Sequence, residues 1–453
     1  MRHHSPLRRR GVAATSLLGV LALGAAACSG PSTSAAEEVD DGAADTVDWS
    51  QVEPASEITW WSNHPGAAKE LEEQFIAEFE AAHPDITVNL VTAGASYDEI
   101  AQRFQAAAGT DEQPDLVIAS DVWWFRYHLN EQIVPLDELL EAIDADAEDY
   151  VPALYADYEF EGQHWAAPYA RSTPLFYYNQ DMWQAAGLPD RGPETWEELA
   201  SWADALDEQV PDDGAPFGLR LGASWSAWWF QNMLWGQGGN YSDSWDVTLD
   251  TPEALAGGQF VHDLFHGSQI ATVSEDTAAD LAGGIIASTI MSTGSLAGVL
   301  EATPDMEIGT AYLPDGPNGE GTPTGGTGVA IASSSTPEEQ LAAAMFLEFL
   351  TNAENTAVYS AATGYMPVRT SAVDGPQMEA LYGEIPQFRT AVDHMADKAR
   401  PQDWVRVFVP TADQLLTDAL EEIVLRGTDP AAAFEQITPQ IERAYEENVE
   451  PYL

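Results

Sequence analysis

The sequence predicts an α/β fold with a largely parallel sheet, built in two domains. Between residues 57 and 119, short apolar runs alternate with helical stretches in the order strand, helix, strand, helix, strand. This alternation is typical of a parallel α/β sheet. Hydrophobic residues make up 45% of the 453-residue chain, and about 400 residues remain after the N-terminal region, which is enough for two cores.

The first five elements follow from local pattern. Apolar runs predict strands at residues 57–61, 86–91 and 115–119. Residues 69–82 are predicted to be a helix, because Leu71, Phe75 and Phe79 fall on one face at helical spacing, and residues 97–108 a second one. The carboxyl ends of parallel strands meet at one edge of a sheet, where ligands of such folds bind. We therefore expect a site near the residues that follow these strands, namely Ser62, Asn63, His64, Tyr97 and Asp121.

Farther along the chain the pattern continues. Thr195 is predicted to cap a helix that runs to residue 206, because Glu198 follows it by three positions. Four tryptophans between residues 225 and 235 are too many for an ordinary surface. Apolar, glycine-broken segments occur at residues 281–300 and 325–332, and helices are predicted at residues 338–350, 413–426 and 430–447.

The N-terminus has the layout of an export signal. Four arginines precede an apolar stretch at residues 12–27, and Cys28, the single cysteine of the chain, follows three alanines. This layout predicts a lipoprotein signal peptide at residues 1–27 with Cys28 as the lipidated residue. Ala25 departs from the usual leucine, so an ordinary secretory signal with a chance cysteine is the alternative. Residues 28–54 are poor in apolar side chains and are predicted to be a flexible tether.

The chain is strongly acidic, with 74 Asp and Glu against 17 Lys and Arg. Four of the arginines lie before residue 28, which leaves 13 basic residues and a formal charge of 13 − 74 = −61 for the rest. This charge argues against binding to nucleic acid or to an anionic membrane surface. It is consistent with a solvated surface in a salty medium.

Catalytic and cofactor motifs are missing from the sequence. Neither Lys69 nor Lys398 follows a glycine, which excludes a P-loop, and Ile331 stands where a dinucleotide-binding glycine would fall after Gly326 and Gly328. His262 and His266 are four residues apart but lack the glutamate of a zinc-protease motif. No Gly-x-Ser-x-Gly elbow occurs. We therefore expect a binding protein without cofactor or metal, and not an enzyme.

Five motifs occur in a characteristic order. They are PYARSTPLFYYN (residues 168–179), STGSLA (292–297), GGTGVAIA (325–332), TGYMPVR (363–369) and VRVFV (405–409). In this order the chain resembles the family-1 solute-binding proteins of ABC importers, and most closely their glycerol-3-phosphate-binding branch, which includes glycerophosphodiester binders. The resemblance extends over residues 57–445.

The resemblance implies a two-lobed, class II periplasmic-binding-protein-like fold with the ligand in the cleft between the lobes. It places the crossings between lobes near residues 168–175, 285–292 and 325–332. On this basis we expect an N-terminal lobe of residues 55–168 plus 290–328 and a C-terminal lobe of residues 169–289 plus 329–453. Closure of the lobes around the ligand is the expected motion.

The resemblance also implies a set of ligand-binding residues. The positions that match the family are Tyr97, Asp121, Ser172, Ser292, Gly326, Tyr365 and Arg406, with Trp225 and Trp228 where relatives place aromatic residues. Their chemistry suits a phosphate held by a guanidinium, hydroxyls and backbone N–H groups, and a glycerol end held by a carboxylate.

Several of these assignments have a structural alternative. Arg406 lies in an alternating Val-Arg-Val-Phe-Val run and would then point outward, Asp121 would cap a helix, the two serines would be turn residues, and Gly326 would serve strand packing alone. The tryptophans would pack in the core. Arg171 either adds a second charge to the phosphate site or bridges to an acidic side chain, and Arg369 is expected to form a structural salt bridge.

The resemblance implies a lipid-anchored, monomeric binding protein on the outer face of the cytoplasmic membrane. Its expected ligand is glycerol-3-phosphate or a glycerophosphodiester such as glycerophosphocholine, which it hands to membrane permease subunits. The short Asp121 and the presence of Arg171 leave the choice between these ligands open. One alternative is the same scaffold binding a sugar or oligosaccharide, and a more distant one is a secreted glycoside hydrolase.

Overall fold

The structure is a computed structural model that describes residues 47–64, 67–110 and 112–453. Residues 48–453 form one compact unit. The expected signal peptide, Cys28 and most of the expected tether lie outside the described residues. The end of the expected tether is ordered, however, because the short helix η1 (Trp49–Gln51) packs its indole against the core and Ala55 N donates to Glu338 O at 2.8 Å. Among the described residues, no helix combines the length and apolarity that a membrane crossing requires.

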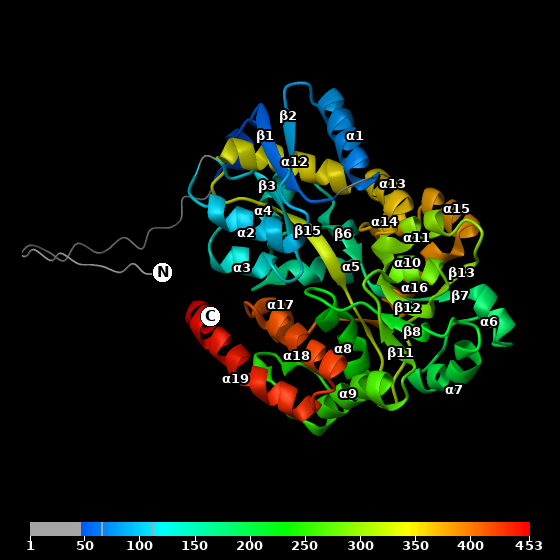
Figure 1. Ribbon diagram of the computed structural model, residues 1–453. Coiled ribbons are helices and arrows are strands. Elements are labelled where there is room, and N and C mark those ends of the chain that lie inside the picture. The colour runs from blue at the N-terminus through cyan, green and yellow to red at the C-terminus, as the bar shows by residue number, and fades with distance from the viewer. Residues whose placement is uncertain (1–46, 65–66, 111) are drawn as a thin grey trace, which may run out of the picture. The chain divides into compact units, whose positions relative to one another are not determined.

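The first sheet has the strand order β2-β1-β3-β15-β6 (Figure 1). Its strands β1, β2 and β3 are mutually parallel, whereas β15 is antiparallel to both β3 and β6. The bounds are β1 Glu57–Ser62, β2 Thr87–Thr92, β3 Leu116–Ser120, β6 Ala167–Ser172 and β15 Gly325–Ile331. The strands predicted at residues 57–61, 86–91 and 115–119 are therefore confirmed, as is their parallel pairing.

The second sheet has the order β11-β8-β12-β7-β13. Strand β8 is parallel to β11 and β12, and β7 is antiparallel to β12 and β13. The bounds are β7 Pro174–Asn179, β8 Ala215–Leu219, β11 Ala271–Val273, β12 Ile286–Ser292 and β13 Ile308–Ala311. Three two-stranded pairs complete the strands: β4 (Glu159–Phe160) with β5 (Gln163–His164), β9 (Ser242–Asp243) with β10 (Asp246–Val247), and β14 (Thr322–Pro323) with β16 (Ala399–Arg400).

Helices cover both sheets. Side-chain caps begin several of them: Ser96 accepts from Glu99 N, Thr195 from Glu198 N, and Thr336 forms a reciprocal capping box with Glu339. The main helices are α1 Ala67–Ala82, α2 Tyr97–Ala107, α3 Trp124–Leu129, α4 Asp137–Ala142, α5 Pro152–Tyr155, α6 Gln180–Ala185, α7 Trp196–Asp207, α8 Ser226–Gly236, α9 Pro252–His262, α10 Thr277–Ala282, α11 Leu296–Ala302, α12 Pro337–Thr351, α13 Ala353–Thr363, α14 Thr370–Val373, α15 Pro376–Glu384, α16 Pro386–Lys398, α17 Trp404–Phe408, α18 Ala412–Arg426 and α19 Pro430–Asn448. The helices predicted from periodicity are thereby confirmed.

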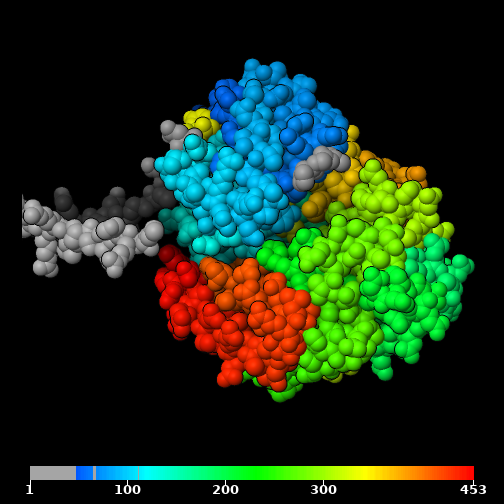
Figure 2. Space-filling view, viewed as in Figure 1, coloured from blue at the N-terminus to red at the C-terminus, as the bar shows by residue number. Residues whose placement is uncertain are grey.

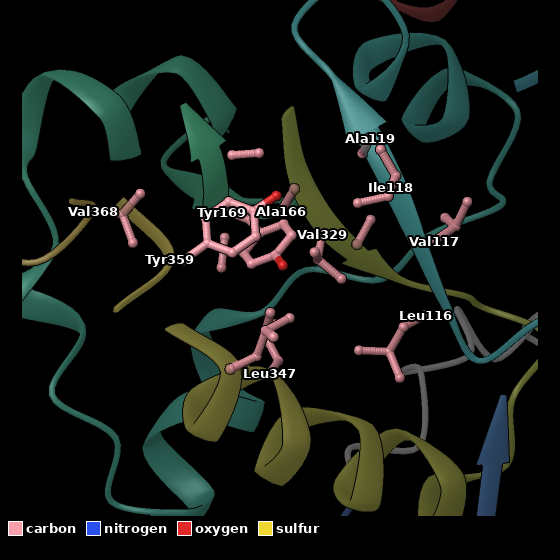
Figure 3. Close-up of a cluster of buried hydrophobic side chains, with 14 of the residues drawn as sticks. Leu116, Val117, Ile118, Ala119, Ala166, Tyr169, Val329, Leu347, Tyr359 and Val368 are labelled. Atoms are coloured by element: carbon pink, nitrogen blue, oxygen red, sulfur yellow. The ribbon is translucent and has the colours of Figure 1, made fainter. Parts of the chain in front are cut away.

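Two clusters of buried side chains form the core. The first surrounds the first sheet and extends to one face of the second sheet, and Figure 3 shows part of it, where Tyr169 and Tyr359 lie against each other near Val329 and Leu347. The second cluster fills the other face of the second sheet beneath α8, α18 and α19. Each sheet therefore anchors its own lobe, which agrees with a two-lobed fold.

The chain crosses between the sheets at a few points. Strand β6 belongs to the first sheet and β7, two residues later, to the second, so one crossing lies at Thr173, as expected. The sheet membership differs from the expected division at several elements. Strand β6, expected to be divided after residue 168, lies wholly in the first sheet, and β12, expected to be divided after residue 289, lies wholly in the second. Strand β13, expected in the first lobe, pairs in the second sheet, and α12, expected in the second lobe, packs on β1 and α1. The reason is that β15 inserts between β3 and β6, which keeps the following helices beside the first sheet.

Candidate ligand-binding site

A cavity of about 390 Å³ lies where residues from both sheets meet. Small-molecule sites span roughly 300–1,000 Å³, so the cavity has room for a small ligand. In Figure 2 the blue and cyan atoms of the first lobe border the green and orange atoms of the second along one face. The lining residues are Asn63, His64, Ala95, Ser96, Tyr97, Asp98, Asp121, Ser172, Arg220, Ala223, Ser224, Trp225, Trp228, Ser292, Gly325, Gly326 and Tyr365. Every residue predicted to bind ligand is on this wall except Arg406.

The carboxyl edge of the first sheet supplies one part of the wall. Asn63 and His64 follow β1, Asp121 follows β3, and Tyr97 begins α2. Asp121 does not cap α3, whose N-cap is Trp123; instead its Oδ2 accepts a hydrogen bond from Gln402 Nε2 at 2.7 Å. The sheet edge therefore presents its polar groups to the cavity, as the strand pattern predicts.

Two tyrosines meet across the cavity wall. The Tyr97 and Tyr365 hydroxyls lie 3.5 Å apart, and burial raises the pKa of both phenols above the ordinary value. Both side chains therefore stay neutral and keep a hydroxyl proton to donate. Tyr365 is placed by Gly364, whose φ of +94° ends α13 and whose Cβ, if present, would lie 2.3 Å from Thr293 O.

Serine and glycine line the wall where the chain crosses between lobes. Ser292 Oγ accepts from Gly294 N at 3.1 Å, which leaves its hydroxyl proton free to donate to a ligand. Ser292 is thus both a turn residue and a cavity residue. Gly326 has φ +95°, and a Cβ there would lie 2.2 Å from Ala170 O, so only glycine fits beside β6. Gly326 therefore both allows close packing against β6 and lines the cavity.

The tryptophan-rich helix divides its side chains between cavity and core. Trp225 and Trp228 line the cavity with ring centroids 6.1 Å apart at 71°, and the Trp228 indole N–H donates to Thr324 O at 2.8 Å. Trp229 and Trp235 are buried away from it. Two of the four rings thus form an aromatic corner that can hold a cation or stack on a sugar.

The position of Arg406 differs from the expectation. VRVFV forms the short helix α17 rather than an extended alternation, and the Arg406 side chain is buried. Its Nε lies 2.9 Å from Asp413 Oδ1, one guanidinium nitrogen lies 3.4 Å from Asp121 Oδ2, and it also donates to Gln402. Burial alone would lower the pKa of Arg406, but the two carboxylates raise it. The guanidinium therefore stands behind Asp121 and not on the cavity wall.

Arg171 and Arg369 are structural. Arg171 is buried, pairs with Asp157 and donates to the Tyr158 hydroxyl at 2.8 Å, which answers the open question about its role. Arg369 pairs with Glu348 and lies 3.7 Å from the ring centroid of Tyr150, in agreement with the expected structural bridge.

Arg220 was missed by the sequence-based prediction. It directly follows β8, is exposed, lines the cavity, and lies 5.2 Å from the Trp225 ring centroid. Within the described part of the chain no carboxylate lies within 4 Å of its guanidinium nitrogens. The signal was available, because Arg220 obeys the same rule of strand carboxyl ends when that rule is applied to the second sheet.

The family model for bacterial extracellular solute-binding proteins matches residues 74–385. The chain belongs to this family. The sn-glycerol-3-phosphate-binding periplasmic protein UgpB of Rhizobium meliloti is 26% identical over 413 residues, covering 85% of this chain and 93% of the relative. UgpB of Escherichia coli K12 is 25% identical over 358 residues, covering 75% and 81%.

Solved structures agree with this membership. The crystal structure of UgpB from Mycobacterium tuberculosis in complex with glycerophosphocholine is 41% identical, with a TM-score of 0.83, and covers 87% of this chain and 100% of that one. The GacH receptor of Streptomyces glaucescens shares the fold at 22% identity and a TM-score of 0.73. The protein is a UgpB-like, extracellular solute-binding protein of an ABC importer. Its family is non-catalytic, so the hydrolase alternative is set aside.

Proposed function

We propose that this solute-binding protein captures a glycerophosphodiester, with glycerophosphocholine favoured over glycerol-3-phosphate, and delivers it to the permease subunits of its importer. One observation carries the proposal: a single cavity combines a guanidinium, two carboxylates, several hydroxyl donors and two tryptophan rings. A glycerophosphodiester with a choline headgroup has a complementary group for each of them. The glycerophosphocholine bound by the UgpB of Mycobacterium tuberculosis supports the same ligand class.

The phosphate is assigned to the donors that line the cavity. Arg220 supplies the guanidinium, while Ser172, Ser292 and Tyr365 supply hydroxyl protons and Gly326 allows close approach of backbone. Arg406, expected to bind the phosphate itself, takes a supporting position in this proposal. It holds Asp121 in place from behind.

The two ends of the ligand are assigned to different lobes. The quaternary ammonium is placed against the faces of Trp225 and Trp228, next to Arg220, which then pairs with the adjacent phosphate. The glycerol end is placed at Asp121 and Tyr97, at the edge of the first sheet.

Calorimetric titration tests the proposal directly. Purified protein lacking residues 1–46 is titrated with glycerophosphocholine, glycerol-3-phosphate, maltose and maltotriose. Saturable binding of glycerophosphocholine, tighter than that of glycerol-3-phosphate, is the expected result. Tight binding of either sugar without binding of the phosphate ligands would contradict the proposal.

A sugar remains the second candidate because of the aromatic corner. Tryptophan faces stack on sugar rings, and Asp121 is able to accept their hydroxyl protons. A neutral sugar, however, leaves Arg220 without an anionic partner, whereas a phosphate gives it one. Arg220 is thus the residue that favours the phosphodiester.

We further propose that lipidated Cys28 anchors a monomer to the outer face of the cytoplasmic membrane. The basic n-region, the apolar stretch and the single cysteine support this assignment. Metabolic labelling with radioactive palmitate should mark the wild-type protein and not the Cys28→Ser variant, and size-exclusion chromatography with light scattering should give the monomer mass. Labelling of both proteins would contradict the anchor.

A further inference from the structure

Two residues that line the cavity, Asn63 and His64, each have one buried polar side-chain atom without a hydrogen-bond partner in the part of the chain that the structure describes. They are 8% and 5% exposed, and within the described residues neither Asn63 Oδ1 nor His64 Nε2 has a partner. Neither residue belongs to the set implied by the family resemblance. Buried polar atoms are normally paired, because an unpaired one loses its hydration without compensation. Two such atoms on a cavity wall indicate that a ligand supplies the missing partners.

The other side of the His64 ring is firmly held. Its Nδ1 lies 3.0 Å from Glu72 Oε1, and the same oxygen accepts from the Ser62 hydroxyl at 2.9 Å and the Tyr169 hydroxyl at 3.3 Å. Glu72 is 1% exposed, and a carboxylate that collects three contacts acts as an acceptor in each. Nδ1 is therefore the nitrogen that pairs with Glu72, and Nε2 is the ring nitrogen left without a protein partner among the described residues.

Aromatic rings fix the orientation of the imidazole. Tyr97, Tyr169, Tyr359 and Tyr365 surround it edge-on, with ring centroids between 5.7 and 6.4 Å from that of His64. These tyrosines and Glu72 are the titratable groups that face the ring. With its plane fixed and Nδ1 paired, His64 is preorganised to form a hydrogen bond with a ligand through Nε2.

The register of the first sheet brings a third acceptor to the same edge. Trp60 pairs with Leu116 and Trp61 with Val117 in parallel strands, so the residues after β1 and those after β3 reach the edge together. Asp121 thus joins Asn63 and His64 on the cavity wall. Arg220, Trp225 and Trp228 come from the second lobe, so the acceptors and the cationic group lie on different lobes.

We propose that Asn63 and His64 bind the two adjacent hydroxyls of the ligand's glycerol end, in addition to Asp121. Nε2 of His64 accepts one hydroxyl proton, and Asn63 Oδ1 and the Asp121 carboxylate share the other in a three-centre hydrogen bond. This inference rests on the proposed function. It orients the ligand with its glycerol end toward the first sheet and its phosphate toward Arg220.

The test compares ligands with and without the glycerol end. Wild type, His64→Leu and Asn63→Ala are titrated calorimetrically with glycerophosphocholine, glycerol-3-phosphate and phosphocholine, each up to millimolar concentration. Loss of one acceptor should weaken the two glycerol-bearing ligands on the order of tenfold and leave phosphocholine unchanged. His64→Gln, whose amide oxygen is an acceptor, should recover part of the affinity.

His128→Leu is the matched control. His128 also has a buried, unpartnered ring nitrogen, at Nδ1, but does not line the cavity, so all three affinities should match those of wild type. The thermal midpoint of each variant without ligand shows that it folds. If the His64 and Asn63 variants weaken all three ligands equally, or none, the inference is wrong while the proposed function stands. If wild type binds no glycerol-bearing ligand, the proposed function fails and the inference with it.

Discussion

The Arg220→Met variant should bind glycerophosphocholine more weakly than wild type and keep the same fold. The guanidinium is exposed on the cavity wall and has no carboxylate partner among the described residues, so the folded state loses no ion pair. Surface changes of this kind alter stability by about 0.5 kcal/mol or less. A hydrogen bond to a charged group contributes about 1.5–3 kcal/mol, which corresponds to a roughly 10- to 150-fold weaker Kd for glycerophosphocholine.

Arg406 is the informative comparison because, unlike Arg220, it is buried and paired with carboxylates. It is 2% exposed and stands between Asp121 and Asp413, so Arg406→Met leaves one buried and one partly buried carboxylate without their cation. Breaking a buried pair in this way costs about 3–5 kcal/mol. The double variant Arg406→Met/Asp413→Asn should regain part of that loss, because one of the uncompensated charges is gone.

Two assays separate the two arginines. Urea unfolding without ligand measures stability, and calorimetry at fixed ionic strength measures affinity for glycerophosphocholine. We expect Arg220→Met to lose affinity for glycerophosphocholine while keeping the stability of wild type, and Arg220→Lys to have an intermediate affinity. Arg406→Met should instead lose stability in urea. If Arg220→Met binds like wild type while Arg406→Met keeps its stability and loses the ligand, the anion is held by Arg406 and our assignment is refuted.

Three further outcomes follow from single contacts. Trp225→Ala should weaken glycerophosphocholine by about 0.5–2 kcal/mol and glycerol-3-phosphate far less, because only the former carries an ammonium; calorimetry with both ligands checks this, and equal losses would speak against the aromatic corner. Gly326→Ala should lower the free energy of unfolding by more than about 1 kcal/mol in urea, since its Cβ would lie 2.2 Å from Ala170 O at a φ of +95°; an unchanged midpoint would contradict the close approach. Burial lowers the pKa of His394 from 6.5 to about 3, so the unfolded chain takes up a proton below pH 6.5 that the folded chain refuses, and stability falls as pH drops from 6.5 toward 3. Between pH 7 and pH 5, the free energy of unfolding of wild type should therefore fall by about 2 kcal/mol more than that of His394→Phe. Equal changes in the two proteins, measured by urea unfolding, would exclude this role of His394.

Local signals were enough to predict most elements and one edge of the site. Strands β1, β2 and β3 are apolar runs, and the Thr195 cap is indicated by Glu198, three residues away. Asp121 follows a strand whose five residues are all buried, and this local fact places it at the sheet edge. The positions of such residues in the fold depend on their neighbours in the sequence, and a single sequence is therefore enough to predict them.

Other features depend on contacts between distant residues. The Arg406–Asp121 pair joins positions 285 residues apart. Nothing in VRVFV indicates that the guanidinium forms ion pairs with two carboxylates of the protein. The lobe to which α12 belongs is likewise decided by the insertion of β15 between β3 and β6. These outcomes are tertiary, and periodicity carries no information about them.

The charge of the whole chain and the pairing of its arginines bear on the ligand together. The chain has 74 acidic residues and 17 basic ones. Most of the basic side chains in the described part form ion pairs with carboxylates, as Arg171, Arg369 and Arg406 do. Arg220 is the one Lys or Arg among the residues described on the cavity wall. A field of this sign repels a phosphate monoester, which carries close to two negative charges at neutral pH, whereas a choline phosphodiester carries no net charge. Among the described residues, the cavity wall holds one guanidinium against two carboxylates, Asp98 and Asp121, so it also disfavours a dianion, while its two tryptophan rings accommodate an ammonium. The charge of the chain and that of the cavity therefore both favour the zwitterionic diester.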